Sequence, residues 1–236
     1  RVLFRSEKEG YAHFMLKEIH EQPRAVRQTL SGRLGAGGAL CLEDEIPAGI
    51  LQGVSDVHLI ACGTAYHAAL YGAYLLNEYT GFQACAELAS EYRYKSVRVD
   101  NHTLAIAISQ SGETADTLGA VRKAKRAGAR ILVITNVVGS TLAREADAVM
   151  YTHAGPEIAV ASTKAYTAQL CCLCLATAYL QQGSGVARSL ELLRRLLEIP
   201  EQMASVLQTC EEQVKQYARR RLAHVRSAFF LGRGLD

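Results

Sequence analysis

Hydroxyl-bearing side chains collect at three points where a short apolar segment meets a helical pattern. Gly63 and Thr64 follow the first apolar segment, residues 109–114 follow the third, and residues 161–163 precede the helix after the fifth. Hydroxyl and amide donors beside the unpaired N–H groups of a helix N-terminus form a favourable site for an anion. The middle segment, Ser-Gln-Ser-Gly-Glu-Thr, is therefore predicted to cradle a phosphate group.

Helix capping is the alternative explanation for the hydroxyls of Ser109, Ser111 and Thr114. A single Ser or Thr often caps a helix by accepting a hydrogen bond from its first turn. One cap needs only one hydroxyl, so the surplus favours a ligand. A neutral, hydroxyl-rich cradle suits a monophosphate on a sugar better than a magnesium-bound polyphosphate.

Other kinds of site have little support in the sequence. It has no Gly-x-x-x-x-Gly-Lys-Ser/Thr segment and no Gly-x-Gly-x-x-Gly turn after the first apolar segment, which disfavours nucleotide triphosphatases and dinucleotide enzymes. The seven histidines form no ligand-spaced cluster, so we expect neither a metal nor another cofactor. Lys164 and Cys62 lie near the predicted pocket, and we expect packing roles for both.

The elements that position these residues are predicted from short apolar runs alternating with helical segments. This pattern indicates an α/β fold, a three-layer doubly wound domain with a five-stranded parallel sheet. The expected strands are His58–Cys62, Gln83–Leu88, Thr103–Ile108, Arg130–Thr135 and Ala148–Tyr151, and the expected helices between and after them are Ala65–Thr80, Thr114–Ala127, a short helix capped by Ser140, and Ser162–Gln182. In such folds ligands bind beyond the carboxyl ends of the strands, where the three junctions would meet.

Helical segments are expected on both sides of this domain. Residues 1–50 are predicted to form a helical entry, with one helix over Tyr11–Gln22 and Pro23 in the first turn of a second. Residues 51–183 would form the α/β domain, and residues 184–224 two connecting helices on either side of Pro200. Residues 225–236 place a glycine after an apolar segment, as residues 59–63 do, and are predicted to begin a second copy of the α/β unit.

Composition indicates a globular protein and a cellular compartment for it. Hydrophobic residues make up 49% of the 236 residues and charged residues 21%, which disfavours disorder. No apolar run is long enough to cross a membrane, and a net charge of +3 is too balanced to favour nucleic acid or an anionic membrane as a partner. Seven cysteines without zinc-type spacing favour free thiols in the cytoplasm.

Three motifs resemble one enzyme family in both order and spacing. They are Ala61-Cys62-Gly63-Thr64-Ala65, the segment 109–117 beginning Ser109-Gln110-Ser111, and the segment 157–165 containing Val160 and Ser162. They are similar to the isomerase half of the glutamine:fructose-6-phosphate aminotransferases, in which a sugar isomerase (SIS) domain occurs twice behind a glutaminase domain. The similarity runs from Tyr11 to the end of the chain, so we expect a fragment carrying the first SIS domain.

The resemblance implies a site and a set of partners. The phosphate of fructose 6-phosphate or glucosamine 6-phosphate would be held by Ser109, Gln110, Ser111 and Thr114, and the sugar by Gly63, Thr64, Val160 and Ser162. Ala65 stands where the family commonly has serine. The family's catalytic glutamate, lysine and histidine would lie outside this chain, which would therefore bind without completing the reaction. The intact enzyme would be a homodimer with the missing glutaminase and second SIS domains, without a nucleic-acid or membrane partner.

Two other functions remain open from the sequence. Another SIS enzyme, such as a sugar-phosphate isomerase or deglycase, would use a similar cradle, although residues 17–23 match the aminotransferases. A sugar-phosphate-sensing effector domain of a transcriptional regulator would be expected to carry a helix-turn-helix, and no convincing one precedes the α/β domain.

Overall fold

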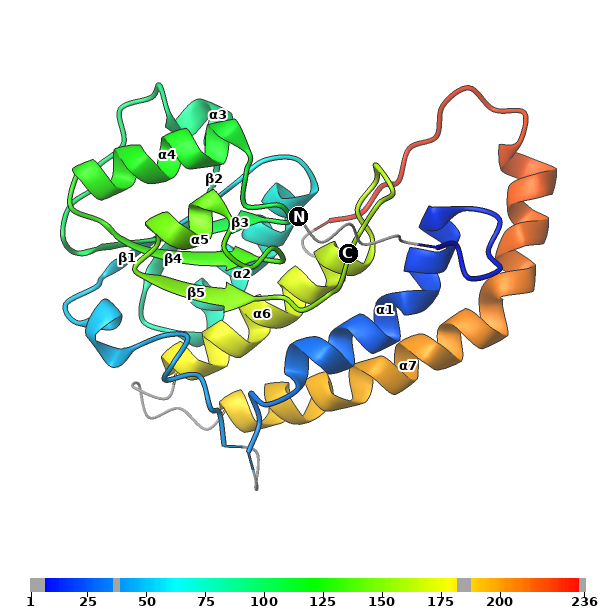
Figure 1. Cartoon of the computed structure of the whole chain (residues 1–236), viewed down its shortest axis with the longest axis horizontal. Helices are drawn as coiled ribbons and strands as arrows, with labels where there is room; N and C mark the ends of the chain where they lie inside the picture. Colours follow the sequence, from blue (N-terminus) through cyan, green and yellow to red (C-terminus); the bar gives the residue numbers. More distant parts are fainter. Residues whose placement is uncertain (1–6, 36–38, 182–187, 234–236) are drawn as a thin grey trace.

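Five parallel strands in the order β2-β1-β3-β4-β5 form the centre of the molecule (Figure 1). This computed structural model describes residues 7–35, 39–181 and 188–233. The strands are β1 (Asp56–Ala61), β2 (Gln83–Leu88), β3 (Thr103–Ser109), β4 (Arg130–Thr135) and β5 (Ala148–Tyr151). The predicted α/β fold is confirmed, and the expected strands differ from the observed ones by at most two residues at either end.

Burial on both faces explains why the central strands are apolar throughout. All seven residues of β3 are buried. Leu104, Ile106 and Ile108 contact one core cluster, whereas Ala105 and Ala107 contact the other. Side chains alternate between the two faces of a strand, so a sheet covered on both sides needs apolar residues at every position.

Helices cover each face of the sheet. One face packs against α2 (Thr64–Tyr79) and α6 (Lys164–Gln181), with α1 (Phe14–Leu30) and α7 (Arg188–Tyr217) outside α6. The other is covered by α3 (Ala89–Tyr92), α4 (Ala115–Arg126) and α5 (Thr141–Glu145), and a short 3-10 turn, η2 (Ala48–Leu51), precedes β1. The sheet and its two helical layers hold the carboxyl ends of the strands in fixed register.

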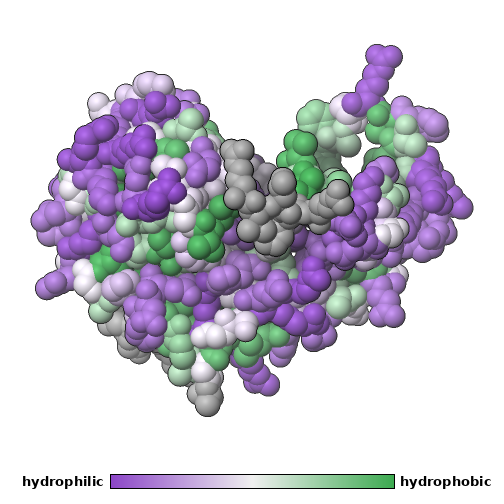
Figure 2. Space-filling view, viewed as in Figure 1, coloured by the Kyte–Doolittle hydropathy of each residue, from purple (hydrophilic) through white to green (hydrophobic). Residues whose placement is uncertain are grey.

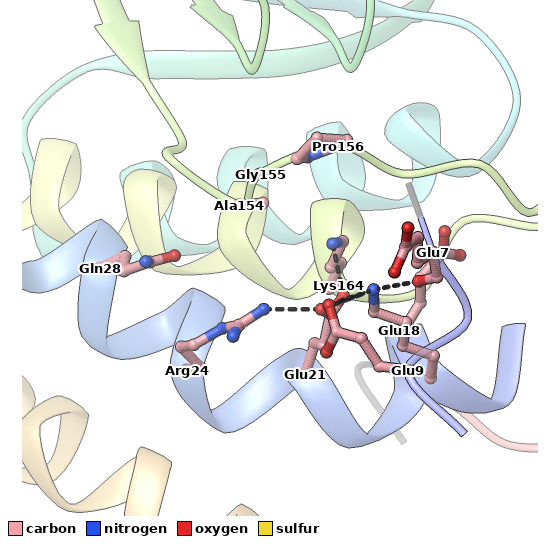
Figure 3. A pocket seen from close by; sticks show the side chains of 11 residues that line it. Glu7, Glu9, Glu18, Glu21, Arg24, Gln28, Ala154, Gly155, Pro156 and Lys164 are labelled. Atoms are coloured by element: carbon pink, nitrogen blue, oxygen red, sulfur yellow. Dashed lines mark hydrogen bonds and ion pairs between the residues drawn. The ribbon is translucent and has the colours of Figure 1, made fainter. Parts of the chain in front are cut away.

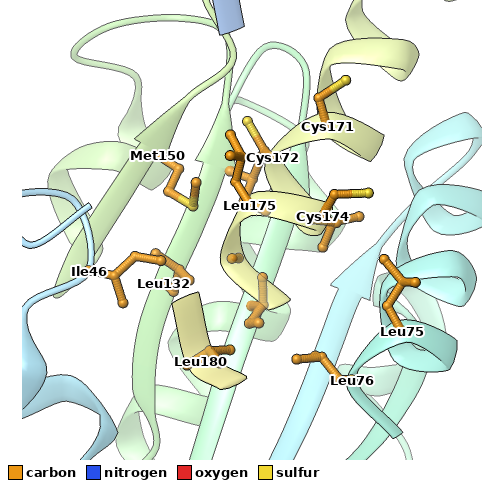
Figure 4. Packing of buried hydrophobic residues seen from close by; sticks show 14 of the residues in the cluster. Ile46, Leu75, Leu76, Leu132, Met150, Cys171, Cys172, Cys174, Leu175 and Leu180 are labelled. Atoms are coloured by element: carbon orange, nitrogen blue, oxygen red, sulfur yellow. The ribbon is translucent and has the colours of Figure 1, made fainter. Parts of the chain in front are cut away.

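Helix α6 is buried around most of its circumference, and small residues allow this close packing. Cys171, Cys172 and Cys174 lie among leucines of α2 and α6 (Figure 4). All three are free thiols, and burial raises the pKa of Cys172 to about 12. A thiol with such a pKa stays protonated at neutral pH, so these cysteines act as packing residues.

The prediction of two helices around Pro23 is wrong, because α1 continues through this residue. Proline lacks the N–H that would bond the carbonyl four residues earlier. That carbonyl belongs to Ile19, and the side-chain amide of Gln22 donates to it at 3.1 Å. The neighbouring glutamine thus replaces the missing backbone donor and allows the helix to continue.

The prediction of two helices on either side of Pro200 is also wrong, whereas the prediction that residues 225–236 begin a second α/β unit stays a prediction. Pro200 lies inside the single helix α7, which is followed by a short π-helical turn, η4 (Ala218–Leu222). Residues 228–231 form no strand, and the side chains of Phe229 to Leu231 are 86–95% exposed. A strand needs a neighbour for its backbone hydrogen bonds, and this segment leaves α7 as an extended loop (Figure 1). Residues 234–236 lie outside the described part of the chain.

Candidate functional site

A cavity of about 210 Å³ lies beside the carboxyl ends of β1 and β3. β2 pairs with one edge of β1 and β3 pairs with the other edge. The strand order therefore reverses between β1 and β3. Open α/β sheets bind ligands at this point. Most of the lining side chains carry a hydroxyl or amide group; the lining comprises Cys62, Thr64, Ala65, Ile108, Ser109, Gln110, Ser111, Thr114, Thr117, Ser162 and Gln169.

Most of the residues predicted from the sequence line this cavity, and they come from all three junctions. Gly63 lies immediately beside it as the N-cap of α2, with a left-handed φ of 60°. The side chain of Val160 is fully exposed and does not line the cavity. The roles proposed for these residues stay predictions, and Val160 has the least geometric support.

The hydroxyls of residues 109–114 do not cap α4. Ser109 Oγ lies 3.1 Å from Thr114 Oγ1 and accepts the N–H of Gly112 at 3.1 Å, while Ser111 Oγ accepts the N–H of Glu113 at 3.2 Å. Thr114 is the N-cap residue, yet its side chain accepts no hydrogen bond from the helix. Among the described residues, no side chain caps the first N–H groups of α4, which are therefore available to an anion.

Contacts with α5 fix the shape of this loop. Gly112 has φ 66°, and a Cβ at this position would lie 2.5 Å from Ser140 Cβ. Ser140 itself caps α5 by accepting the N–H of Ala143. Glu113 accepts the N–H of Thr141 at 2.8 Å, and this hydrogen bond holds the pKa of Glu113 below its usual value. The cradle is thus preformed against a neighbouring helix.

The loop that carries Ser162 is held by two carboxylates of the chain itself. Glu157 accepts the Ser162 hydroxyl at 3.0 Å and the N–H groups of Thr163 and Ala165 at 2.9 and 3.1 Å. These contacts neutralise the N-terminus of α6, which therefore has less capacity for a ligand anion than the uncapped α4. A phosphate is consequently expected at α4.

Glu18, a residue of α1, holds the same loop from the other side. Its carboxylate is 2% exposed and accepts the N–H groups of Ile158 at 2.5 Å and Ala159 at 3.2 Å. These bonds connect the helical entry to the loop that ends at Ser162. The entry helix is thus part of the framework of the cavity.

A second cavity, of about 390 Å³, lies between α1 and residues 154–156 (Figure 3). It contains cations, but carboxylates already pair with them: Lys17 Nζ lies 2.7 Å from Glu9 Oε1, and Lys164 Nζ lies 2.6 Å from Glu21 Oε2. Lys164 is 3% exposed, and its ion pair with Glu21 connects α6 to α1. This cavity is a poorer phosphate site than the hydroxyl-rich one.

Comparisons with known proteins identify the family. Residues 50–178, more than half of the chain, match the family model described as the SIS domain. The chain belongs to the SIS domain family. The match includes all five strands and the loops that line the hydroxyl-rich cavity.

Relatives of this SIS domain include curated enzymes. Glutamine–fructose-6-phosphate aminotransferase [isomerizing] of Symbiobacterium thermophilum is 51% identical over 98% of this chain, and that of Streptomyces coelicolor is 50% identical over 97%. The chain spans 38% and 37% of the lengths of these two relatives. The resemblance predicted from the three motifs is confirmed.

A solved structure gives the same relationship. The C-terminal domain of glucosamine-fructose-6-phosphate aminotransferase from Francisella tularensis superimposes with a TM-score of 0.84 at 35% identity. The alignment covers 90% of this chain and 62% of that one.

Within the described part of the chain, no helix is both long and apolar enough to span a membrane.

Two residues of the SIS domain line the cavity although the sequence did not single them out. Thr117 of α4 and Gln169 of α6 are 1% and 2% exposed. Gln169 lies in the body of α6, away from the helix N-termini where ligand contacts are expected, whereas Thr117 lies in the first turn of α4 and within the segment 109–117. The available signal was a polar residue at an otherwise buried helix position, which is clearest for Gln169 between Ala168 and Leu170.

Proposed function

We propose that this chain is the sugar-phosphate-binding part of an enzyme that makes glucosamine 6-phosphate from fructose 6-phosphate and glutamine. The observation that carries the proposal is the uncapped N-terminus of α4 beside three hydroxyls at the strand-order reversal. Similarity to aminotransferases over almost the whole chain supports this function over another SIS enzyme or a regulatory sensor.

The geometry suggests how the ligand would lie. The phosphate would accept hydrogen bonds from Ser109, Ser111 and Thr114, from the Gln110 side chain and from the first N–H groups of α4. The sugar would extend toward Thr64 and Ser162, which line the cavity from the other two junctions. Ala65 also lines it but supplies no hydroxyl.

The chain itself would bind rather than catalyse. Ammonia addition at C2 and proton transfer between C1 and C2 need a positioned amine and an acid/base group. The described residues that line the cavity supply hydroxyl, amide and thiol groups but no carboxylate, lysine or histidine. We therefore assign this chemistry to the glutaminase and second SIS domains of the intact enzyme, a cytoplasmic homodimer in this proposal.

Calorimetric titration tests the proposal directly. Fructose 6-phosphate and glucosamine 6-phosphate are expected to bind the chain, whereas unphosphorylated fructose is not. Ser109→Ala/Ser111→Ala removes two donors to a charged group, each contributing about 1.5–3 kcal/mol, so affinity should fall about a hundredfold or more.

Ser205→Ala, an exposed hydroxyl deletion on α7, is the matched control and should bind like the wild type. Thermal unfolding would verify that every variant is folded. Equal binding of fructose and fructose 6-phosphate, or full affinity in the double variant, would remove the basis for a phosphate site at α4.

A further inference from the structure

Gln169 places an unpaired amide at the hydroxyl-rich cavity. Its side chain is 2% exposed and lines the cavity from α6. Within the described part of the chain, this amide forms no hydrogen bond with another residue, and its atoms are not fully enclosed by protein but open onto the cavity. Buried polar groups in folded proteins nearly always have a hydrogen-bond partner. The amide of Gln169, which opens onto the cavity without a protein partner, is therefore free to bind water or a ligand there.

The surroundings of Gln169 make a packing role a poor explanation. Positions 165, 168, 171 and 172 of the same helix are buried Ala or Cys, so an apolar side chain would suit this environment. A glutamine is unfavourable there unless its amide meets water or a ligand in the cavity.

The direction from which Gln169 approaches indicates which part of the ligand it contacts. Helix α6 covers one face of the sheet, whereas α4, with the phosphate cradle at its N-terminus, covers the other. A carboxamide both donates and accepts hydrogen bonds, as a sugar hydroxyl does, while a phosphate dianion only accepts.

We propose that Gln169 hydrogen-bonds the sugar of the bound sugar phosphate and helps to distinguish it from phosphate alone. This inference rests on the proposed function and adds a sugar-contacting residue outside the three motifs. The contact comes from the body of α6 rather than from a loop, so it would position the sugar rigidly relative to the sheet.

The substitution Gln169→Met keeps the length of the side chain and removes both hydrogen-bonding groups. We expect fructose 6-phosphate to bind about tenfold more weakly or worse, while the affinity for inorganic phosphate stays unchanged. The melting temperature of the ligand-free chain should stay the same or rise, because the amide has no protein partner to lose. Ser111→Ala should instead weaken both ligands.

Thr177→Val is the matched control on the same helix. Among the described residues the enclosed Thr177 hydroxyl has no partner either, but Thr177 does not line the cavity, so this variant should bind both ligands normally. Should Gln169→Met fold poorly, Gln169→Asn keeps the amide and shortens its reach. This variant should lose affinity for fructose 6-phosphate alone.

Two results would overturn the inference while the proposed function stands. The first is wild-type affinity of a folded Gln169→Met for fructose 6-phosphate. The second is an equal loss for fructose 6-phosphate and inorganic phosphate, which would place the amide at the phosphate. A wild-type chain that binds neither sugar phosphate would instead refute the proposed function, and this inference with it.

Discussion

At the scale of single residues, the phosphate cradle depends on a backbone shape that few sequences adopt. Gly112 combines a left-handed φ with contact against Ser140, so the loop turns back on α5 within six residues. This arrangement turns the hydroxyls of Ser109 and Thr114 toward each other and leaves the first turn of α4 open. Rigid positioning of donors before the ligand arrives reduces the entropy cost of binding.

Replacing Gly112 by alanine tests this requirement. The left-handed backbone costs about 1–2 kcal/mol for alanine, and the collision with Ser140 adds about 1–3 kcal/mol. We expect both a lower melting temperature and weaker fructose 6-phosphate binding. Gly139→Ala is the control, since Gly139 has φ 70° but open space around it. Equal effects of the two substitutions would show that the contact with Ser140 is unimportant.

At the scale of elements, the sequence predicted the strands better than the flanking helices. Uninterrupted apolar runs with clear borders, such as 103–109 and 130–135, give the sheet and most of its site. Both prolines lie inside helices, contrary to the prediction. A proline inside a helix is tolerated when another group replaces its N–H. At Pro23 this group is the side-chain amide of Gln22, a local contact within α1 that propensity rules do not include.

No pattern in the sequence predicted the contact between α1 and the loop before α6. From the sequence, residues 17–23 are only a family motif. In the structure Glu18 has a physical role, because its carboxylate accepts a backbone N–H 140 residues further along the chain. Sequence spacing carries no signal for a contact over such a separation. For the same reason Gln169 was recognisable only as an unusual polar residue in a buried helix.

Glu18→Leu tests whether the entry helix supports the site. Two N–H groups, of Ile158 and Ala159, would lose a charged acceptor inside the protein, which should cost about 2–4 kcal/mol of stability. Fructose 6-phosphate should also bind more weakly, because the loop ending at Ser162 loses its anchor. The control Glu201→Gln breaks an exposed ion pair between α1 and α7 and should cost less than about 1 kcal/mol.

For Glu18→Leu, the readouts are the free energy of unfolding from urea titration and the affinity from calorimetry. A variant with lowered stability but unchanged affinity would show that Glu18 supports the fold and not the site. Glu18→Gln should fall between the wild type and the leucine variant, since its amide oxygen can still accept one of the two bonds.

At the scale of the whole molecule, the α/β unit and the C-terminal part of the chain differ in how well they are covered. On the face seen in Figure 2, the α/β unit is largely hydrophilic with scattered apolar patches, and apolar side chains also appear on the part of the molecule around the end of α7. Beyond η4, the exposed apolar residues include Val225, Phe229, Phe230 and Leu231. Apolar residues so exposed and so close in sequence indicate a surface that contacts further protein.

Self-association of the chain is the consequence that can be measured. We expect sedimentation velocity to show concentration-dependent oligomers, and Phe229→Ser/Phe230→Ser to reduce them by removing two side chains that are 86% and 95% exposed. Affinity for fructose 6-phosphate should not change, because neither residue lines the cavity. The control Tyr94→Ser removes an aromatic side chain, 79% exposed, on the opposite helical layer and should leave association unchanged. Unaltered oligomers in the double variant would place the contact elsewhere, with the exposed face of α7 as the next surface to test.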